Sequence, residues 1–537
     1  MLCSALAALA SGQREGTAPP PRLRQVEVRT ADIFGPEWTG NYTLSKFVNA
    51  LHATTKEGVV RREIWLQPGQ PVSRELADEV ERNLRATGLF AEVKVELVAV
   101  EGTDEVDLVV TTRDKLSLSF GGGASYVGGV AGFRAAIGEG NLLGTGDRIA
   151  LTFSQNSDKE YRGSIAYTDL HVLDTWHVGN VRFSSTDEGD SFGLDLRRPI
   201  KHLADPFGYG GNAHRDEEDI EYYRDGESVA QVFTRSSVLA GDTTWASGPR
   251  DQRRYLGFAA QLADVRHRPA TGPMAPMIDV PGDTLSLYLG VHARWELIDD
   301  FRKIDGLDTI DYVQDLQLGL SLTTTAGVRW RDEAGQDGAA QPEAGLRLEW
   351  AKELLDEVFV DCRARGTARW QDGDTVGWQS QLGTWLFVMT GKDNTVGLSA
   401  TYDAAEELQD LPIEFTLGED NGLRGYPARQ LSGTRRLRVN LENRFDTRLE
   451  YATFRLGVVT FFDAGWVGDD RELGSPYESV GVGLRVASKP LLGDGLLRLD
   501  LAKPLDEAVG TGDGWRVSFA VGQVFTFGGN ASALGTR

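Results

Sequence analysis

The sequence predicts a mainly β protein: an antiparallel transmembrane β-barrel of about 16 strands that follows one small α+β domain. Apolar and polar residues alternate in many segments between about residue 115 and residue 527, for example over residues 285–297 and 480–486. Such alternation is typical of strands that face lipid on one side and water on the other. The chain has no run of about 18 apolar residues, which excludes transmembrane helices. Its 63 glycines suit tight turns and bent strands.

The composition narrows the possible functions. A net charge of −23 argues against nucleic acid as a partner, because a basic face supplies most of the affinity for nucleic acid. The two cysteines, Cys3 and Cys362, lie far apart and indicate neither a disulfide framework nor a metal site. Seven scattered histidines form no H-E-x-x-H motif. We therefore predict no metal site.

The first 21 residues are predicted to be the remnant of a leader. Residues 1–10 are short and apolar and end in Ala8-Leu9-Ala10, which resembles the end of a secretory signal with a small-residue cleavage site. The basic region that normally precedes such a segment is missing. We expect that the true start lies upstream or that the signal is degenerate.

Residues 22–114 form the predicted α+β domain, with the element order β-α-α-β-β. A four-residue spacing of Leu76, Val80 and Leu84 predicts one buried helical stripe, Ser73 is a suitable N-cap for that helix, and Gly88 lies just past its end. The predicted elements are a strand at 23–33, a helix at about 44–63, the capped helix, and strands at 90–98 and 106–112.

Residues 115–527 form the predicted barrel, and residues 528–537 a C-terminal tail. About 410 residues, at roughly 10 per strand plus turns and longer outer loops, give about 16 strands. An even number of strands brings both ends of the barrel to the same side of the membrane.

The segment Gly422-Leu423-Arg424-Gly425-Tyr426-Pro427 places an arginine between two glycines in a predicted loop, residues 419–434. About forty residues later, Asp463 lies on a predicted strand. Its parity is opposite to that of the lipid-facing residues of the strand, so the carboxylate is predicted to face the barrel lumen. Arginine can pair bidentately with a carboxylate and keeps its charge on burial. The sequence thus predicts a contact between Arg424 and Asp463 if the loop folds inward.

These features together resemble the outer-membrane assembly and transport barrels typified by BamA and TamA, a bacterial surface antigen family. Residues 22–114 resemble a polypeptide-transport-associated (POTRA) domain, and the segment 140–146 matches the N-L-x-G-x-G region of the second barrel strand. The resemblance implies a Gram-negative-type outer membrane with the POTRA-like domain in the periplasm. It also implies a loop locked inside the lumen, with the residues Gly422, Arg424, Gly425, Tyr426 and Asp463.

The two ends of the barrel carry a second part of the resemblance. Residues 116–120 and three following glycines are similar to a weakened first strand, and residues 522–527 are similar to the C-terminal signal of barrel proteins. Ala520 and the ten residues after Phe527 depart from that pattern. The resemblance implies a lateral gate between first and last strands, where unpaired backbone groups can accept another chain. The candidate seam residues are Leu116, Leu118, Phe120, Gly522, Phe525 and Phe527.

The function implied by the resemblance is outer-membrane protein insertion or polypeptide translocation without covalent chemistry or a cofactor. The expected partners are unfolded outer-membrane or secreted client polypeptides and membrane lipid, with periplasmic chaperones or accessory lipoproteins as further candidates. A passive pore or structural barrel, sealed at the seam, is the main alternative. The POTRA-like domain could bind client strands at a sheet edge or could be a spacer.

One motif favours a third function. Gly189-Asp190-Ser191-Phe192-Gly193 fits G-x-S-x-G, the nucleophile elbow of hydrolases, and would make Ser191 the nucleophile of a lipid hydrolase. That elbow requires a strand, a turn and a helix, whereas a strand-like segment follows here. With 63 glycines in the chain, a chance match is the simpler interpretation.

Overall fold

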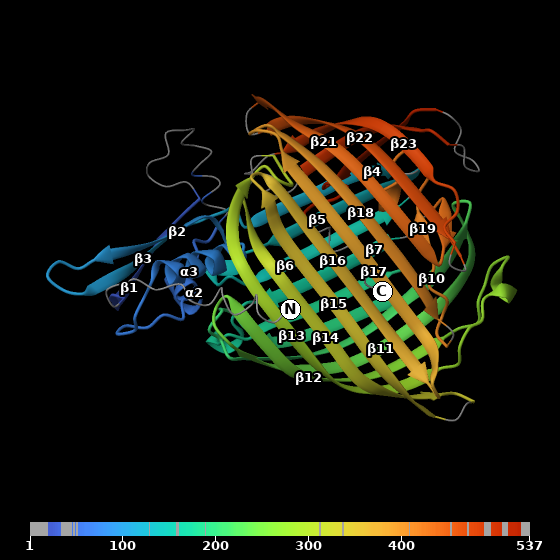
Figure 1. The fold of residues 1–537 in the computed structure, drawn as a ribbon, viewed down its shortest axis with the longest axis horizontal. Coiled ribbons are helices and arrows are strands. Elements are labelled where there is room, and N and C mark those ends of the chain that lie inside the picture. Colours follow the sequence, from blue (N-terminus) through green and yellow to red (C-terminus); the bar gives the residue numbers. More distant parts are fainter. Residues whose placement is uncertain are drawn as a thin grey trace, which may run out of the picture. The chain divides into compact units, whose positions relative to one another are not determined.

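We describe the protein from a computed structural model, shown in Figure 1. It describes residues 20–33, 46, 49, 52–127, 129–156, 161–187, 189–310, 313–335, 338–407, 409–451, 454–469, 472–487, 496–506 and 514–527. The predicted leader, apart from its last two residues, and the predicted tail at 528–537 lie outside the described residues. The chain divides into two compact units: unit 1 comprises Met1–Ser117 with Leu143–Gly146, and unit 2 comprises Leu118–Leu142 with Asp147–Arg537.

Unit 1 contains a three-stranded sheet with the strand order β1-β3-β2, in which β1 and β3 run parallel. Its core is made by side chains that are fully buried, such as Val60, Val80 and Leu108. Ser73 accepts a hydrogen bond from the Leu76 amide at 3.5 Å, so the predicted N-cap is confirmed. The elements are β1 (Arg22–Ala31), α2 (Glu57–Arg62), α3 (Arg74–Ala86), β2 (Phe90–Ala99) and β3 (Glu105–Asp114).

The helix predicted at about 44–63 is wrong over residues 52–56, which have no regular secondary structure and are followed by the short helix α2. The physical reason is a buried carboxylate. Asp114 accepts hydrogen bonds from the backbone amide and hydroxyl of Thr55, at 2.6 and 2.9 Å. The His52 ring bridges the same carboxylate, at 2.7 Å, and the Ser117 hydroxyl, at 2.8 Å. These bonds replace the backbone pairs of a helix.

Ser117, His52 and Asp114 have the residue types of a catalytic triad, but their placement suits a structural role. The side chains of His52 and Asp114 are fully buried, and Ser117 is also buried. A hydrolase nucleophile must meet its substrate, whereas this serine lies in the segment that leads from β3 into β4. We therefore propose that the hydrogen bonds between Ser117, His52 and Asp114 anchor that segment within unit 1.

The segment Leu143–Gly146, which belongs to unit 1, packs against the same stretch of chain. The Lys56 amide donates to the Gly144 carbonyl at 2.9 Å. A Cβ atom on Gly144 would lie 2.4 Å from the Thr54 carbonyl oxygen, so only glycine fits. This contact gives a physical reason for a glycine in the predicted N-L-x-G-x-G region.

We expect Gly144→Ala to loosen this contact. Gly144 has a φ of +74°, and Gly129 has a similar φ of +91° with open space around its Cβ position. Gly129→Ala is therefore a control that adds the same backbone strain without the clash. Overpacking of this kind costs about 1–3 kcal/mol, so the Lys56 amide should exchange with deuterium roughly 10–100-fold faster in Gly144→Ala alone. Equal acceleration in both variants would show that the close contact is unimportant.

Over the residues that the structure describes, unit 2 contains one two-stranded sheet and one large antiparallel sheet of 20 strands, to which the strands below belong. The first six are β4 (Leu118–Val127), β5 (Val130–Glu139), β6 (Arg148–Asn156), β7 (Tyr161–Asp169), β8 (Val178–Thr186) and β9 (Asp190–Arg198). Six long strands follow: β10 (Phe207–Arg224), β11 (Glu227–Ser247), β12 (Gln252–His267), β13 (Thr284–Asp305), β14 (Val313–Glu333) and β15 (Ala339–Leu355). The last eight are β16 (Val358–Gln371), β17 (Asp374–Met389), β18 (Asn394–Glu407), β21 (Arg435–Tyr451), β22 (Phe454–Gly468), β23 (Tyr477–Ala487), β24 (Leu496–Pro504) and β25 (Arg516–Val521).

The 20 strands exceed the predicted 16 because many connections are shorter than expected. Two-residue turns such as Asp225-Gly226 and Asp372-Gly373 join long hairpins, with both residues at positive φ as that turn type requires. Neighbouring strands lie side by side in chain order (Figure 1). We call the end of the sheet at which β4 begins the near end. The turn before β10 lies at the same end, because the strands alternate in direction.

The strand order returns to its start through β25 and β4. These two strands share one register pair, Phe519 with Tyr126. By contrast, β24 and β25 share six pairs and β4 and β5 share ten. The junction of β25 and β4 is thus the weakest in the sheet, and we call it the seam.

The two faces of the sheet differ as the alternation predicted. Apolar side chains such as Leu285, Leu289 and Val458 are exposed on the outer face. Charged side chains such as Arg444, Asp463 and Asp500 are buried on the inner face. This is the distribution of a barrel with an apolar outside and a polar interior. Among the described residues, no helix has the length and apolar character needed to cross a membrane.

Candidate functional site

The residues 409–434, between β18 and β21, fold against the inner face of the sheet. Within them, β19 (Phe415–Leu417) and β20 (Leu431–Gly433) pair with each other, and the short helix η4 (Glu419–Asn421) precedes the predicted arginine motif. Leu417, Leu423 and Tyr426 form a small apolar core that is almost fully buried. The only regular strands of this segment, among its described residues, are thus β19 and β20, of three residues each.

Arg424 meets Asp463 as the sequence predicted. Its Nε donates to Asp463 Oδ2 at 2.7 Å and its Nη2 to Oδ1 at 2.8 Å, which is a bidentate pair. Both side chains are fully buried. The guanidinium group also stacks on the Phe461 ring at 3.4 Å from the ring centroid. The arginine is thus enclosed on its flat face as well as along its donor edge.

Two further carboxylates, which the sequence interpretation did not name, complete the site. Arg424 Nη1 donates to Glu442 Oε1 at 2.7 Å and lies 3.8 Å from Asp500 Oδ2. Both acids are fully buried. They come from β21 and β24, the two strands that lie on either side of β22 and β23. Their parity could have identified them as candidates from the sequence, because both residues share the lumen-facing phase of their strands. We call Arg424, Asp463, Glu442 and Asp500 the lock.

The glycines and the tyrosine of the motif fit the loop into this space. Gly422 and Gly425 have φ values of +106° and +87°, which favour glycine. A Cβ atom on Gly425 would approach Ala502 at 3.3 Å, so the loop lies close to the wall. Tyr426 is fully buried, and its hydroxyl donates to the Glu478 carbonyl at 2.8 Å. The motif residues therefore converge where the resemblance implied.

A second set of contacts holds the loop 409–434 at the far end of the sheet, beside the tip of the β10–β11 hairpin. Glu414 pairs with Arg224, and the Ser432 hydroxyl donates to the Tyr223 carbonyl at 2.7 Å. Leu411 packs into an apolar cluster with residues of β10 and β11. Because β10 and β11 are eight and seven places from β18 in the sheet, the loop spans the far opening of the barrel.

The C-terminal residues 522–527 depart from the prediction. The last strand was expected to continue to Phe527, but β25 ends at Val521, and Gly522 turns with a φ of +92°. Phe525 is 3% exposed and packs in an apolar cluster of the inner face with Leu307 and Phe387. We call residues 522–527 the latch.

The latch replaces strand pairing with contacts inside the barrel. The Phe527 amide donates to Asp308 Oδ1 at 2.6 Å, and Gln523 Nε2 donates to the Asp308 carbonyl at 3.0 Å. The ring centroids of Phe527 and Phe387 lie 5.8 Å apart at a steep angle. An apolar pocket and a carboxylate thus outcompete the backbone pairs that a longer β25 would make with β4.

Two arginines connect the latch to the lock. Arg444 Nε donates to Glu442 Oε2 at 2.8 Å, and its Nη2 donates to the Phe525 carbonyl at 2.6 Å. Arg485 Nη1 donates to Asp500 Oδ1 at 2.6 Å, and its Nε donates to Gln523 Oε1 at 3.2 Å. Each arginine therefore binds one acid of the lock and one residue of the latch, and the two groups form one buried network.

The six predicted seam residues lie in different places. Leu118 and Phe120 are on β4, where their register partners belong to β5. Leu116 precedes β4 in unit 1, and Gly522 is the first residue after β25. Phe525 and Phe527 are part of the latch. The prediction that these two phenylalanines line the seam is therefore wrong, and the pair Phe519 and Tyr126 marks the seam instead.

The structure gives Ser191 no nucleophile elbow. The residue lies within β9, opposite Ser184 of β8 in an antiparallel hairpin, where a strand–turn–helix is required. Among the described residues, no group of three or more His, Cys, Asp or Glu side chains is placed to hold a metal ion.

Comparisons with known proteins agree with this architecture. Residues 141–525 match the Omp85 superfamily domain, and residues 46–114 match a POTRA domain described as a surface antigen variable number repeat. Similar solved structures include BamA from Haemophilus ducreyi lacking POTRA domains 1–3, with 13% identity, 94% of this chain and 84% of that chain covered, and a TM-score of 0.42. CdiB from Escherichia coli has 11% identity, 94% and 76% coverage, and a TM-score of 0.44.

The match over residues 141–525 covers well over half of the chain and confirms the resemblance to the BamA and TamA superfamily. A barrel of this family that follows a POTRA domain belongs to the Gram-negative outer membrane, with the POTRA domain in the periplasm. The near end of the sheet, where the chain enters β4, is accordingly the periplasmic end. The chain is a member of the Omp85 superfamily: an outer-membrane β-barrel protein with a periplasmic POTRA domain.

Proposed function

We propose that this protein inserts or translocates client polypeptides by opening its barrel laterally between β25 and β4. Protein insertion or translocation is the activity of the family, whose members are not enzymes. The observation that carries the proposal is the seam, with its single register pair. In this mechanism, an unpaired edge of β4 accepts a client strand, and lipid burial of the new strand supplies the driving force.

The energy needed to part the seam supports this mechanism. A backbone hydrogen bond contributes about 1 kcal/mol net, so one register pair resists opening by about 1 kcal/mol. The six pairs of β24 with β25 amount to about 6 kcal/mol on the same basis. Opening at the seam is therefore the least costly way to break the ring of strands.

The latch adds a second reason. A β25 that continued to Phe527 would pair with more of β4 and seal the barrel. Because residues 522–527 turn inward at Gly522, β4 keeps backbone groups free of β25 along most of its length. A client strand that binds there meets no resident strand that it must displace.

A passive pore fits the barrel interior less well. The loop 409–434 reaches from β18 to the tip of the β10–β11 hairpin, the lock is buried beside β21–β24, and the latch packs with Leu307, Phe359 and Phe387 at the periplasmic end. A constantly open channel would need a continuous wet path past all three. Protein segments at three levels of the lumen therefore favour a barrel that works through its wall.

The POTRA domain offers a further place for client binding. In its sheet, β3 is central, so β1 and β2 are the edge strands. The outer edge of β2 has no strand partner among the described residues. A client segment could pair there before it reaches β4. Charged residues on β2, such as Lys94 and Glu96, would limit uncontrolled pairing.

The proposal is tested by reconstitution of the full chain in liposomes with an unfolded client barrel. We expect the client to fold faster than in empty liposomes, measured by its resistance to protease and its altered electrophoretic mobility. The ion conductance of the same vesicles should stay low. A high conductance without faster client folding would favour the passive pore and sink the proposal.

A further inference from the structure

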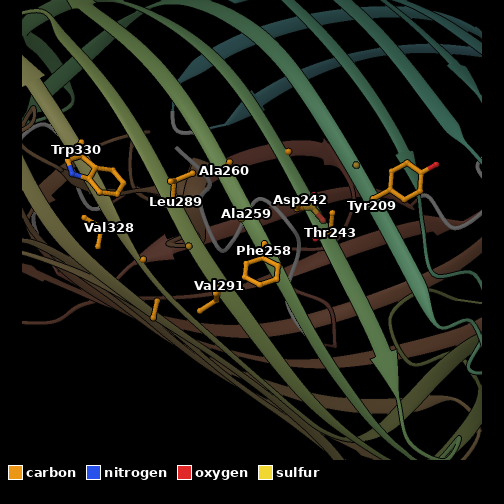
Figure 2. Close-up of a pocket in the computed structure, with 15 residues that line it drawn as sticks. Tyr209, Asp242, Thr243, Phe258, Ala259, Ala260, Leu289, Val291, Val328 and Trp330 are labelled. Atoms are coloured by element: carbon orange, nitrogen blue, oxygen red, sulfur yellow. The ribbon is translucent and has the colours of Figure 1, made fainter.

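An open depression of about 820 Å³ lies on the outer face of the sheet, across β10–β14. Figure 2 shows Phe258 and Val291 side by side near its middle, with Tyr209 and Trp330 toward its two ends. These four residues are 40–56% exposed in the absence of lipid: Phe258 56%, Val291 42%, Tyr209 40% and Trp330 46%. The depression is thus part of the surface that faces the membrane, and we call it the outer furrow.

The strand register explains the shape of the outer furrow. One row of outward side chains runs through Tyr209, Thr243, Phe258, Val291 and Ala326, which are successive register partners. The next outward row contains small residues where it crosses β11 and β12, namely Gly241 and Ala260, before Leu289 and Val328. The furrow lies between these rows and is deep where the small residues leave it unfilled.

The length and slope of the outer furrow fit one hydrocarbon chain. It crosses five strands at a spacing of about 4.8 Å, which gives a length of about 19 Å. One leaflet of a bilayer contributes about half of a hydrocarbon core that is about 30 Å thick. Tyr209 lies near the periplasmic start of β10, whereas Ala326 lies far along β14. The furrow therefore climbs from the periplasmic surface into the hydrocarbon.

The periplasmic end of the furrow is polar and cationic. The Tyr209 hydroxyl contacts His177 Nε2 at 2.6 Å, and Arg198, the register partner of Tyr209, stacks over the Trp176 ring at 5.6 Å. Arg198 Nη2 and the Lys201 backbone amide donate to the carboxylate of the turn residue Asp205, at 3.1 and 3.3 Å, and Arg253 Nη2 donates to the Asp205 carbonyl. Arg198 and Lys201 are thus two cationic residues beside one carboxylate at this end, whereas Arg253 is buried and shares the inward phase of β12.

The opposite end has the opposite charge. Asp332 is the next outward residue after Trp330, and it is exposed. A phosphate group would be repelled there and attracted at the Tyr209 end. The apolar lining, the slope and the charge difference therefore all select the same orientation for an amphipathic molecule.

We propose that the outer furrow is a binding site for a diacyl phosphoglyceride of the periplasmic leaflet. One acyl chain lies across β10–β14 between Tyr209 and Trp330. The phosphate lies beside His177, Tyr209 and Arg198. Ordinary lipid contact with a barrel is spread evenly around its wall, whereas this site holds one lipid in one place on the tall side of the barrel, away from the seam.

The test fills the furrow and measures lipid contact. Gly241→Leu with Ala260→Leu places two side chains in open space, because a Cβ atom on Gly241 would meet only the Gly210 carbonyl, at 3.5 Å. Gly163→Leu is the matched control. A Cβ atom on Gly163 meets nothing within 4 Å, and its register partner Phe153 is exposed on the outer face of a different strand pair.

The full chain in nanodiscs is irradiated with a phosphatidylglycerol that carries a photoactivatable group on one acyl chain, and labelled peptides are identified by mass spectrometry. We expect the label to concentrate on β11–β13. The double variant should reduce labelling there roughly tenfold, the cost of displacing about two methylene groups, while Gly163→Leu leaves it unchanged. The electrophoretic mobility of each variant shows whether it has folded. If the double variant fails to fold, the same labelling is measured on Ala260→Leu alone.

Three results would overturn the proposal. Labelling that is even around the barrel, or unchanged in the filled variants, would show that no site exists. A neutral diacylglycerol probe with the same acyl chain that labels equally well would remove the role of the phosphate. The third result is a second copy of the protein bound at the outer furrow. It would block labelling and would add the mass of one more protein chain to the nanodisc.

Discussion

Arg424→Ala is expected to lower the free energy of unfolding by about 3–5 kcal/mol, because it leaves a buried carboxylate without its partner. Asp463 would keep two hydrogen bonds but no cation: one from Asn440 Nδ2, at 2.7 Å, and one from the backbone amide of residue 424, at 3.3 Å. Glu442 would retain Arg444, so the uncompensated charge falls mainly on Asp463. Urea unfolding of the full chain in lipid vesicles measures the change.

A matched control separates the lock from lumen arginines in general. Arg347 also lies on the inner face, pairs with Glu349 at 2.5 Å, and has a side chain that is 56% exposed. Removal of such an exposed pair costs about 0–1 kcal/mol, so Arg347→Ala should be nearly neutral. Arg424→Lys keeps the charge but loses the bidentate fork and should fall between the two. Similar costs for Arg424→Ala and Arg347→Ala would contradict the assigned role of the lock.

The lock also bears on the seam through the buried network. Arg444 and Arg485 each bind one lock acid and one latch residue. Loss of Arg424 shifts the charge balance around Glu442 and Asp500, so both arginines would be drawn toward the acids and away from the latch. The lock is therefore joined to the latch by buried contacts, and we expect a change in one to alter the other.

The inward phase of Asp463 could be predicted because side chains on a strand alternate with a fixed period of two. The same rule placed Glu442 and Asp500 on the inner face, but it could not select them. Inward-facing charged residues are frequent on these strands, and which of them converge on Arg424 depends on the stagger between β21, β22 and β24. The register of the whole sheet sets that stagger. The alternation of residues along a single strand carries no information about this register.

The position of the latch could not be predicted for a different reason. Phe519, Val521, Phe525 and Phe527 share one parity, so the local pattern predicts a strand that continues to Phe527. The structure breaks the strand at Gly522, because Leu307, Phe359 and Phe387 form a pocket for the phenylalanines. These residues lie more than 130 positions earlier in the chain, so the competing contact leaves no trace near the C-terminus.

The second large effect is expected from a disulfide across the seam. Phe519→Cys with Tyr126→Cys joins register partners of β25 and β4, whose Cα atoms are about 4.5–5.5 Å apart in an antiparallel pair. Cys3 and Cys362 must be replaced by serine to prevent mispairing. The control uses the same Phe519→Cys with Leu499→Cys, which joins β25 to its other neighbour, β24. Both disulfides constrain β25, but only the first closes the seam.

The most direct measurement is client folding by these two oxidised proteins in liposomes, before and after reduction. If the barrel works by lateral opening, the seam disulfide should abolish the acceleration of client folding, and a reductant should restore it. The β24–β25 disulfide should leave the acceleration unchanged under both conditions. Full activity of the oxidised seam variant would contradict lateral opening.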